Sequence, residues 1–309
     1  MSADQQDLSG AAVRTEGLTK AYRGIVAVDR VSVRVEENSI CGLLGRNGAG
    51  KTTMMKLLTG QLFPTSGEAW VLGNQPTPAG GELKDVCFVA EDQRYPDSFA
   101  ARHVFTAAGW FYQDWDADYA ADLVKRFDLP VGRRISKLSR GQRSAVGIIL
   151  GLASRARLTI FDEPYAGLDA VARHLFYDEL LRDFTERPRS ILVSTHLIDE
   201  IAHLLDRVLV IDHGRILIDQ EAEALRGASF AVAGPAEAVD RFAQSRTVLG
   251  RERVGGLASV AIDGRLDAAE SAEAARLGLE ISEVSLQQLV VNATTRQEEA
   301  PALAGARGK

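Results

Sequence analysis

Residues 40–53 read ICGLLGRNGAGKTT, and this stretch decides the fold class. The apolar run at its start predicts a short buried strand, and the residues that follow the loop have the spacing of a helix. Between them, Gly45, Gly50, Lys51 and Thr52 match the pattern of a loop that binds phosphate groups. Glycines let backbone N–H groups converge on the phosphates, and the helix N-terminus adds positive potential. The stretch therefore predicts an α/β fold with a phosphate site where the strand ends.

A second motif supplies acidic groups for the same site. Residues 158–163 read LTIFDE, which predicts a buried strand that ends in two carboxylates. We expect Asp162 to hold Mg2+ through water and Glu163 to polarise the attacking water as a general base. Lys51 is expected to reach the β- and γ-phosphates of a nucleotide, and the Thr52 hydroxyl to coordinate the Mg2+. An acid at a strand end also caps helices in many proteins, but the phosphate loop favours the catalytic interpretation.

Other apolar runs complete a mostly parallel sheet. Short, nearly continuous apolar segments suit strands that are covered on both faces, and they occur at 158–161, 191–194 and 208–211. Before the phosphate loop, residues 13–35 alternate apolar and polar side chains, most clearly at 27–35, as half-buried antiparallel strands do. We therefore expect an antiparallel β subdomain ahead of a parallel core.

Helical spacing dominates an insert in this core at about 95–155, where Pro130 and Gly132 interrupt the pattern. We expect an inserted helical subdomain there. Aromatic residues crowd its first part, and they either form its core or line a groove for a partner. These residues are Phe99, Phe105, Trp110, Phe111, Tyr112, Trp115 and Tyr119.

The composition shifts to Ala, Glu, Arg and Gly after about residue 227, without a phosphate or metal motif. The order of patterns there predicts a small α/β accessory domain over 228–292. A flexible tail is expected over 1–12, and a disordered tail over the polar, Ala- and Gly-rich residues 293–309. The expected elements of the accessory domain are strands at 230–233, 247–253, 258–262 and 279–284, helices at 236–243 and 268–277, and a final turn at 286–291.

Composition limits the partners and the compartment. The 309 residues carry a formal net charge of -6, whereas a nucleic-acid binder usually has a concentrated basic face, so we expect no nucleic-acid partner. Cys41 and Cys87 lie in apolar segments, which fits buried thiols in a reducing cytoplasm rather than a disulfide framework or a metal site. Residues 1–10 lack the features of a secretory signal. The longest apolar run, 145–153, is far shorter than the roughly 20 residues that cross a bilayer, so a membrane role would go through a partner.

A third motif narrows the family. Residues 138–142 read LSRGQ, which closely resembles the LSGGQ signature of ABC ATPases, with Arg140 where the family has glycine. The motif stands at the start of an apolar helical stretch and shortly before the strand that ends in two acids, as in the family. The resemblance covers about 13–227 and implies an ABC ATPase domain. It also implies that Ser139 and Gly141 contact the γ-phosphate bound on an opposite subunit.

Further positions match the family's elements in order. Tyr22 stands where the family has an aromatic that stacks on adenine, although such a tyrosine alone usually packs on a strand. Asp169 matches the loop that crosses the dimer interface, and His196 resembles the switch histidine that contacts the γ-phosphate and orients the attacking water. Glu91 aligns with a glutamine that links the nucleotide site to the helical subdomain, and Gln93 is a competing assignment. The resemblance implies further nucleotide contacts from Gly45, Asn47, Gly48, Gly50, Lys51, Thr52, Thr53, Gln142 and Asp162, and metal contacts from Thr52, Asp162 and Glu91.

The resemblance implies an ATP-driven motor that works as a dimer. Two ATP molecules, each with Mg2+, would lie between the phosphate loop of one subunit and the LSRGQ segment of the other, in a homodimer or in a heterodimer with a second ATPase. The implied partner is a membrane-spanning permease, which would hold the chain at the cytoplasmic face of the membrane. The spacing of residues 195–200 and the lack of a long C-terminal regulatory domain favour export. The alternative is a soluble ABC ATPase with a nontransport or regulatory role.

Overall fold

The computed structural model describes residues 10–77 and 83–305, with side chains up to residue 295. By its contacts the chain divides into two units. The first comprises Met1–His196 and Leu204–Asp219, and the second comprises Leu197–His203 and Gln220–Lys309. This division falls ahead of the domain boundary expected after residue 227, which remains a prediction.

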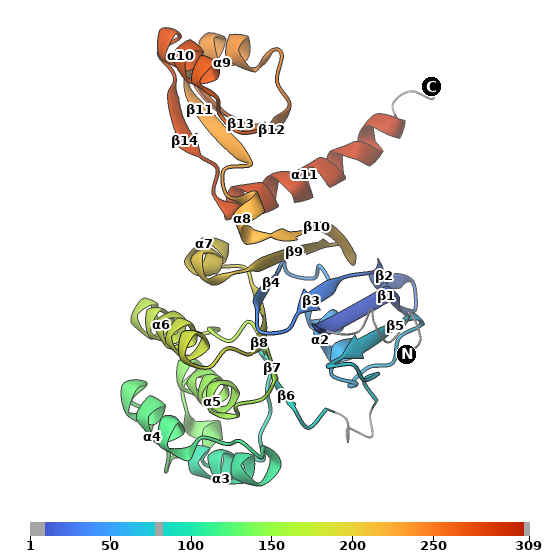
Figure 1. Ribbon diagram of the computed structural model, residues 1–309, viewed down its shortest axis with the longest axis vertical. Coiled ribbons are helices and arrows are strands. Elements are labelled where there is room, and N and C mark those ends of the chain that lie inside the picture. Colours follow the sequence, from blue (N-terminus) through green and yellow to red (C-terminus); the bar gives the residue numbers. More distant parts are fainter. Residues whose placement is uncertain (1–9, 78–82, 306–309) are drawn as a thin grey trace. The chain divides into compact units, whose positions relative to one another are not determined.

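A six-stranded sheet forms the centre of the first unit, in the order β10-β9-β4-β8-β7-β6 (Figure 1). The strand before the phosphate loop, β4, pairs in parallel with β8 and β9, and β7 pairs in parallel with β6 and β8. Every residue of β4, β7 and β8 is buried, which explains their nearly continuous apolar sequences. The expected α/β fold with a mostly parallel sheet is confirmed. The strands are β4 (Ile40–Leu44), β6 (Val86–Val89), β7 (Leu158–Asp162), β8 (Ser190–Thr195), β9 (Arg207–Asp212) and β10 (Arg215–Glu221).

A smaller antiparallel sheet contains three strands that precede β4 in sequence and β5, which follows it, and the long strand β1 (Ala11–Tyr22) pairs with all of its other strands. The alternating segment 27–35 does not form one strand. It is divided because β2 pairs with the second half of β1, where Tyr22 lies opposite Ile25, whereas β3 pairs with its first half. The other strands are β2 (Ile25–Val31), β3 (Arg34–Glu36) and β5 (Ser66–Val71).

Helices α3, α4 and α5 come from the segment where an insert is expected, and α5 packs against β6 and β7. Glycines allow this close approach: a Cβ atom at Gly147 would lie 2.7 Å from Val89, and one at Gly151 would lie 2.5 Å from Phe161. The aromatic residues fall into packed and exposed groups. Phe105 stacks on Trp115 with ring centroids 6.1 Å apart, whereas Trp110 and Phe111 are exposed. The helices of the first unit are α2 (Lys51–Leu58), α3 (Ala101–Phe111), α4 (Ala117–Arg126), the 3-10 turn Ile135–Lys137, α5 (Arg140–Ala153) and α6 (Ala170–Glu186).

The second unit contains an antiparallel sheet in the order β12-β13-β11-β14, with α9 and α10 packed on one face (Figure 1). Its chain order of strand, helix, two strands, helix and strand is the split βαβ arrangement. The expected strands and helices of this region are confirmed, and α9 has the predicted bounds. The elements are β11 (Ser229–Pro235), α9 (Ala236–Ala243), β12 (Val248–Val254), β13 (Leu257–Asp263), α10 (Ala268–Arg276) and β14 (Glu280–Glu283), with the short helices α7 (Ile198–Ile201) and α8 (Ala222–Leu225) and the 3-10 turn Ala202–Leu204 at the unit's boundaries.

The C-terminal end of the chain differs from expectation, because α11 (Leu286–Gly305) replaces the predicted turn and most of the predicted tail. The Asp199 carboxylate accepts a hydrogen bond from the Gln287 N–H at 3.1 Å at the start of the helix, and Val290 of the same helix is buried. Only residues 306–309 of the expected tail lie outside the described part. At the other end, β1 begins at Ala11, inside the tail expected over 1–12, and residues 1–9 are outside the described part.

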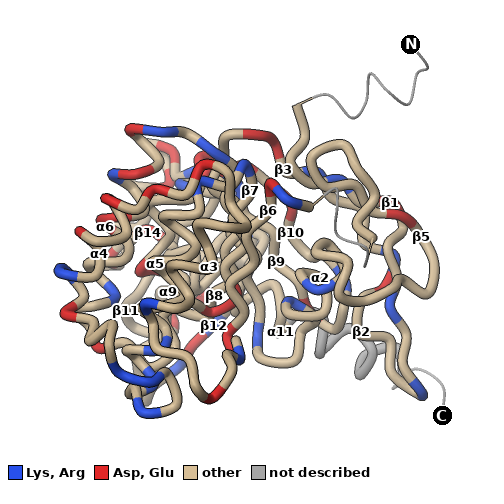
Figure 2. The backbone as a smooth tube through the Cα atoms, turned by 90° about the horizontal axis from the view of Figure 1, so that it is seen from below, with Lys and Arg blue, Asp and Glu red and all other residues tan. Residues whose placement is uncertain are grey.

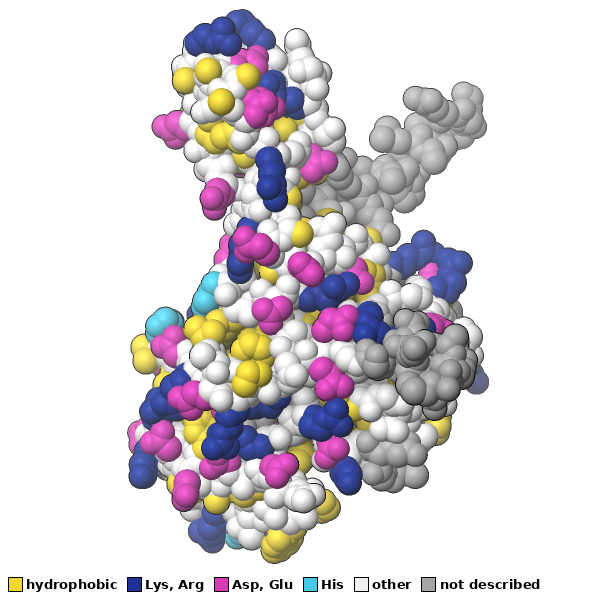
Figure 3. Space-filling model, viewed as in Figure 1, with side chains coloured by type: hydrophobic (Ala, Val, Ile, Leu, Met, Phe, Trp, Pro, Cys, Tyr) yellow, Lys and Arg dark blue, Asp and Glu magenta, His cyan; other side chains and the backbone are white. Residues whose placement is uncertain are grey.

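The described surface carries both kinds of charge. Lys and Arg alternate with Asp and Glu along the chain in Figure 2, and the two kinds mix on the face shown in Figure 3. Cys41 and Cys87 are buried and form no disulfide, and burial raises the pKa of both thiols. Within the described residues, no helix has the length and apolar character needed to span a bilayer.

Candidate nucleotide-binding and hydrolysis site

The phosphate loop connects β4 to α2, and two of its glycines are required by close contacts. A Cβ atom at Gly45 would lie 2.2 Å from the Ile211 carbonyl oxygen, and one at Gly50 would lie 2.4 Å from the Ala27 carbonyl oxygen. Both glycines also have positive φ angles, of 156° and 115°. The loop is thereby held with its backbone against β9 and the β2 segment.

Lys51 begins α2 and is almost completely buried, with 6% of its surface exposed. Its ammonium group donates hydrogen bonds to the carbonyl oxygens of Gly45 at 2.8 Å and Arg46 at 3.2 Å. The same nitrogen lies 3.4 Å from Oε1 of Glu163. A buried cation therefore stands inside the loop and has an acidic partner from β7's end.

A cavity of about 270 Å3 opens beside this lysine, and we call it the phosphate-loop cavity. Residues of the phosphate loop, Glu163 after β7 and Glu91 after β6 all line it, although they are far apart in sequence. Half of the nucleotide-contacting residues predicted from the sequence line this cavity. The lining residues are Ala27, Asn47, Gly48, Gly50, Lys51, Thr52, Thr53, Glu91 and Glu163.

Thr52 and Asp162 form a pair of oxygen ligands at one end of this site. The Thr52 hydroxyl donates to Oδ2 of Asp162 at 2.7 Å, and the Ser194 hydroxyl donates to the other carboxylate oxygen, also at 2.7 Å. Mg2+ prefers such hard oxygen donors and usually keeps water and phosphate oxygens as its remaining ligands. The residues present therefore fit the Mg2+ predicted from the sequence.

Glu163 is held with its two oxygens in different surroundings. Its carboxylate is buried, and Oε2 receives hydrogen bonds from the Tyr165 hydroxyl and from Nδ1 of His196, the latter at 2.6 Å. Oε1 has no hydrogen bond within the described residues and faces the Lys51 ammonium. One oxygen thus fixes the side chain, and the other forms an ion pair with Lys51 without a hydrogen bond among the described residues.

Tyr165 is a site residue that the sequence reasoning missed. Its hydroxyl lies 2.6 Å from the Thr195 hydroxyl and accepts from the His196 backbone N–H at 3.0 Å, in addition to its bond with Glu163. Burial, and then the charge of Glu163, raise the pKa of Tyr165, which keeps the phenol protonated and able to donate. Ser194 was also missed, and it accepts from the Glu163 backbone N–H at 3.0 Å. The proximity of Tyr165 to Glu163 in sequence was the available signal.

The signature residues lie outside the phosphate-loop cavity of their own chain. Ser139 caps α5, accepting from the Gln142 N–H at 3.1 Å while the Gln142 side chain accepts from the Ser139 N–H at 3.1 Å. Gly141 permits a close approach, since a Cβ atom there would lie 2.5 Å from the Gly167 carbonyl oxygen. The segment therefore forms the capped start of α5 rather than part of the cavity wall.

Three further predicted positions can be placed. Tyr22 ends β1 and is half exposed, and the Lys20 ammonium lies 5.3 Å from its ring centre. Asp169 caps α6 by accepting from the Ala172 N–H at 2.8 Å. Neither lines the phosphate-loop cavity, and both remain predictions as nucleotide contacts. Of the two alternatives after β6, Glu91 lines this cavity, whereas Gln93 lines a neighbouring one.

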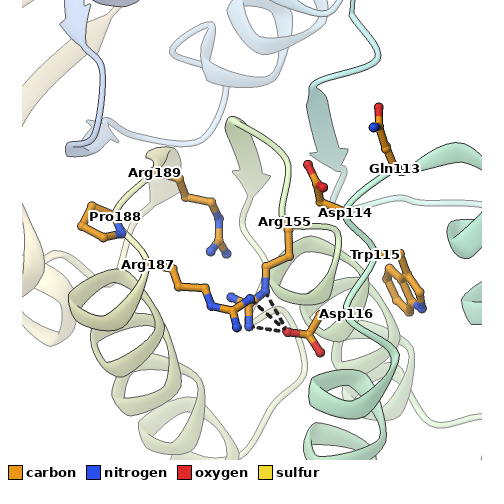
Figure 4. Close-up of a pocket in the computed structure, with 8 residues that line it drawn as sticks. All are labelled: Gln113, Asp114, Trp115, Asp116, Arg155, Arg187, Pro188 and Arg189. Carbon is orange, nitrogen blue, oxygen red and sulfur yellow. Dashed lines mark hydrogen bonds and ion pairs between the residues drawn. The ribbon is translucent and has the colours of Figure 1, made fainter.

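A larger cavity of about 510 Å3 lies elsewhere in the first unit, beside the loop before β8 (Figure 4). Its arginines already have acidic partners. Asp116 pairs with Arg155 at 2.9 Å and with Arg187 at 3.3 Å, and Asp183 pairs with Arg155 and Arg189. These ion pairs join the helical segment to α6 and β8, and we assign no ligand to the cavity.

A phosphate loop and an acidic strand end around one cavity define the class of phosphate-loop nucleotide-binding proteins. The family model described as "ABC transporter" matches residues 28–166. The ABC transporter ATP-binding protein YtrB of Bacillus subtilis is 30% identical over 191 residues, which cover 62% of this chain and 65% of the relative. The Nod factor export ATP-binding protein I of Mesorhizobium japonicum is 32% identical over 224 residues, 70% of this chain and 65% of that protein. The uncharacterised ABC transporter ATP-binding protein YcbN of Bacillus subtilis is 33% identical over 225 residues, 70% of this chain and 71% of that protein.

Solved structures agree on the fold. An ATP-binding subunit of an ABC transporter superposes with a TM-score of 0.62 at 22% identity, covering 69% of this chain and 91% of the other. A dimeric cassette in a post-hydrolysis state, bound to ADP and phosphate, gives 0.61 at 21% identity, covering 68% and 98%. The relative that is 33% identical over 71% of its own length shows that the chain belongs to the ABC transporter ATP-binding proteins. It spans about 65% of the length of the first two relatives.

Proposed function

We propose that this chain is the ATP-binding and ATP-hydrolysing subunit of an ABC transporter and drives substrate translocation by a separate membrane-spanning permease. The observation that carries the proposal is the carboxylate of Glu163, which lines the phosphate-loop cavity and has its Oε1 3.4 Å from the Lys51 ammonium. A cation for phosphates and a positioned base in one cavity are the requirements of nucleotide hydrolysis.

Each group in the cavity has a separate task in this proposal. Lys51 exchanges its bonds with loop carbonyl oxygens for bonds with the β- and γ-phosphates of ATP. Oε1 of Glu163 accepts the proton of the attacking water, while Tyr165 and His196 keep the other oxygen in place. Thr52 and Asp162 would hold Mg2+, which supplies positive charge to the phosphates when bound.

The active form in this proposal is a dimer. Ser139 and Gly141 lie outside the cavity of their own chain, which supports a site completed by the signature segment of a second subunit. ATP then joins the two subunits, and hydrolysis lets them separate, which moves the permease. The second subunit is another copy of this chain or a different ATPase. The dimer would sit on the cytoplasmic face of the membrane through the permease.

Export is the proposed direction, supported by the Nod factor export ATP-binding proteins among the relatives. The alternative is a soluble ABC ATPase with a nontransport or regulatory role. On the side shown in Figure 3, basic and acidic side chains are mixed, so this side has no concentrated basic face for nucleic acid. A regulator that only binds ATP would not need the oriented base that Glu163 provides.

The first experiment compares ATP hydrolysis by the parent protein and by Glu163→Gln. The variant should lose at least about 100-fold in turnover, because the water loses its base, and should still bind ATP. Glu186→Gln is the matched control, since Glu186 is exposed at the end of α6. Hydrolysis by Glu163→Gln near the parent rate would remove Glu163 from the proposed role.

A second experiment addresses the partner. The native protein is fractionated from its own cells, and the membrane fraction is solubilised in mild detergent. The transporter proposal expects the chain to co-purify stoichiometrically with a protein that has several membrane-spanning helices. Recovery only in ribosomal or soluble complexes would favour the nontransport alternative.

A further inference from the structure

Glu91 and Arg140 are two positions where the sequence departs from the family pattern, and the structure pairs them with each other. Nη2 of Arg140 donates to Oε1 of Glu91 at 2.9 Å across a sequence separation of 49 residues. We propose that Arg140 is a positioning and charge-compensating residue for Glu91. It allows a carboxylate to stand in the wall of the phosphate-loop cavity without weakening the binding of the triphosphate.

The charges around the cavity create the need for this compensation. Glu91 lines the phosphate-loop cavity together with Lys51 and a second carboxylate, Glu163. Lys51 lies 3.4 Å from Glu163 and is the group expected to meet the phosphates. The charge of Glu91 therefore needs another cation, because an uncompensated carboxylate repels a polyanionic ligand. Arg140 provides that cation from the opposite side.

A second cavity of about 240 Å3 lies behind Glu91, and Arg140 enters its wall. Glu91 lines both cavities, so its side chain stands between the phosphate loop and the start of α5. Arg143, in the same turn as Arg140, also lines the second cavity but donates to the Leu138 carbonyl oxygen at 2.8 Å. The two arginines thus have different partners.

Packing directs Arg140 towards Glu91. A Cβ atom at Gly167 would lie 2.6 Å from Cγ and 2.9 Å from Cβ of Arg140, so a glycine with a φ of 80° makes room for the arginine stem. Arg140 is the first residue of α5, where the helix dipole disfavours a cation, and the first turn of α5 contains no acidic residue. Glu91 supplies the missing negative charge from another loop.

The pair is partly exposed, with 65% of the Arg140 side chain and 46% of the Glu91 side chain accessible. Exposed ion pairs add little to folding stability, so we expect the pair to affect nucleotide affinity rather than unfolding. Mg2+ would reduce the effect, because it adds positive charge to the phosphates themselves.

The test is a double-mutant cycle in nucleotide binding, and it rests on the proposed function. A fluorescent ATP analogue is titrated, in EDTA and in Mg2+, into the parent protein, Arg140→Gln, Glu91→Gln and the double variant, at concentrations where the protein is monomeric. In EDTA, Arg140→Gln should weaken binding about two- to fivefold, and the double variant should return to the parent affinity. The loss should be smaller in Mg2+. In EDTA, where no metal ion is bound, Glu91→Gln alone should bind at least as tightly as the parent.

Controls separate charge compensation from a structural effect. Arg143→Gln removes the same charge from the same turn and should bind like the parent. Arg140→Lys keeps the charge and should also bind like the parent, while thermal unfolding verifies that each variant is folded. Equal weakening in Arg140→Gln and in the double variant would overturn the inference, as would equal affinity in all four proteins. Failure of the parent itself to bind the analogue would instead overturn the proposed function.

Discussion

Tyr165 connects the proposed base Glu163, His196 and Thr195 of β8 through one hydroxyl group. Tyr165→Phe keeps the buried ring and removes these bonds. We expect the turnover of ATP to fall about tenfold or more, because a hydrogen bond to a charged group is worth roughly 1.5–3 kcal/mol and here it orients the reacting carboxylate. The KM for ATP should stay within about twofold, since Tyr165 does not line the phosphate-loop cavity. Steady-state kinetics across ATP concentrations measures both constants.

A matched variant distinguishes positioning from packing. Tyr177 is equally buried but lies on α6 against Phe176, away from the cavity. Tyr177→Phe should therefore leave turnover close to that of the parent. A rise in KM with unchanged turnover in Tyr165→Phe would show that the hydroxyl serves nucleotide binding instead of the hydrolysis step.

At the scale of elements, the second unit has a core of its own. Phe242 on α9 is fully buried, packs edge-to-face on Phe230 with ring centroids 6.4 Å apart, and lies under the Arg246 guanidinium. Phe242→Ala should destabilise this unit by about 3–5 kcal/mol through lost burial and a cavity. Calorimetry should then show a separate transition at lower temperature, with ATP binding retained in the first unit.

The control is Phe63→Ala in the first unit, where 67% of Phe63 is exposed, so the change should be within about 0.5 kcal/mol. If the Phe242→Ala variant lost ATP binding at the same temperature as its lowered unfolding transition, the two units would not unfold separately.

The same scale divides what the sequence could predict from what it could not. Buried strands such as β4 and the amphipathic helix α9 could be predicted from local patterns. A continuous apolar run predicts a strand buried on both faces, and apolar residues at helical spacing predict a helix with one buried face. Helix α11 was missed although Ser285 and Gln288 form a local capping pair at its start, a signal that the sequence contains. The pair of Glu91 and Arg140 left no such local signal, because 49 residues separate the two side chains and their contact depends on how the chain folds back.

At the scale of the whole molecule, the site in one chain is incomplete under the proposed function. Ser139 caps α5 outside the phosphate-loop cavity, whereas Lys51 lies inside it. If the two residues act on the same ATP from different subunits, a defect in one can be complemented by a subunit with a defect in the other. Two variants then suffice for a test: Lys51→Ala removes the cation, and Ser139→Asp keeps a good helix cap but faces the phosphates with a negative charge.

Each variant alone should hydrolyse ATP poorly, and an equimolar mixture should regain activity. Random exchange of subunits makes about half of the dimers mixed. Each mixed dimer has one intact site and one doubly defective site, so about one quarter of all sites are intact. If the sites act independently, the mixture should regain about one quarter of the parent activity. The matched control mixes Lys51→Ala with the Lys51→Ala/Ser139→Asp double variant, which cannot assemble an intact site and should stay inactive. Recovery in the first mixture alone would place Lys51 and Ser139 at one ATP from two subunits. An inactive first mixture that nevertheless contains mixed dimers would contradict independent shared sites, because the intact half-sites would be present without producing hydrolysis.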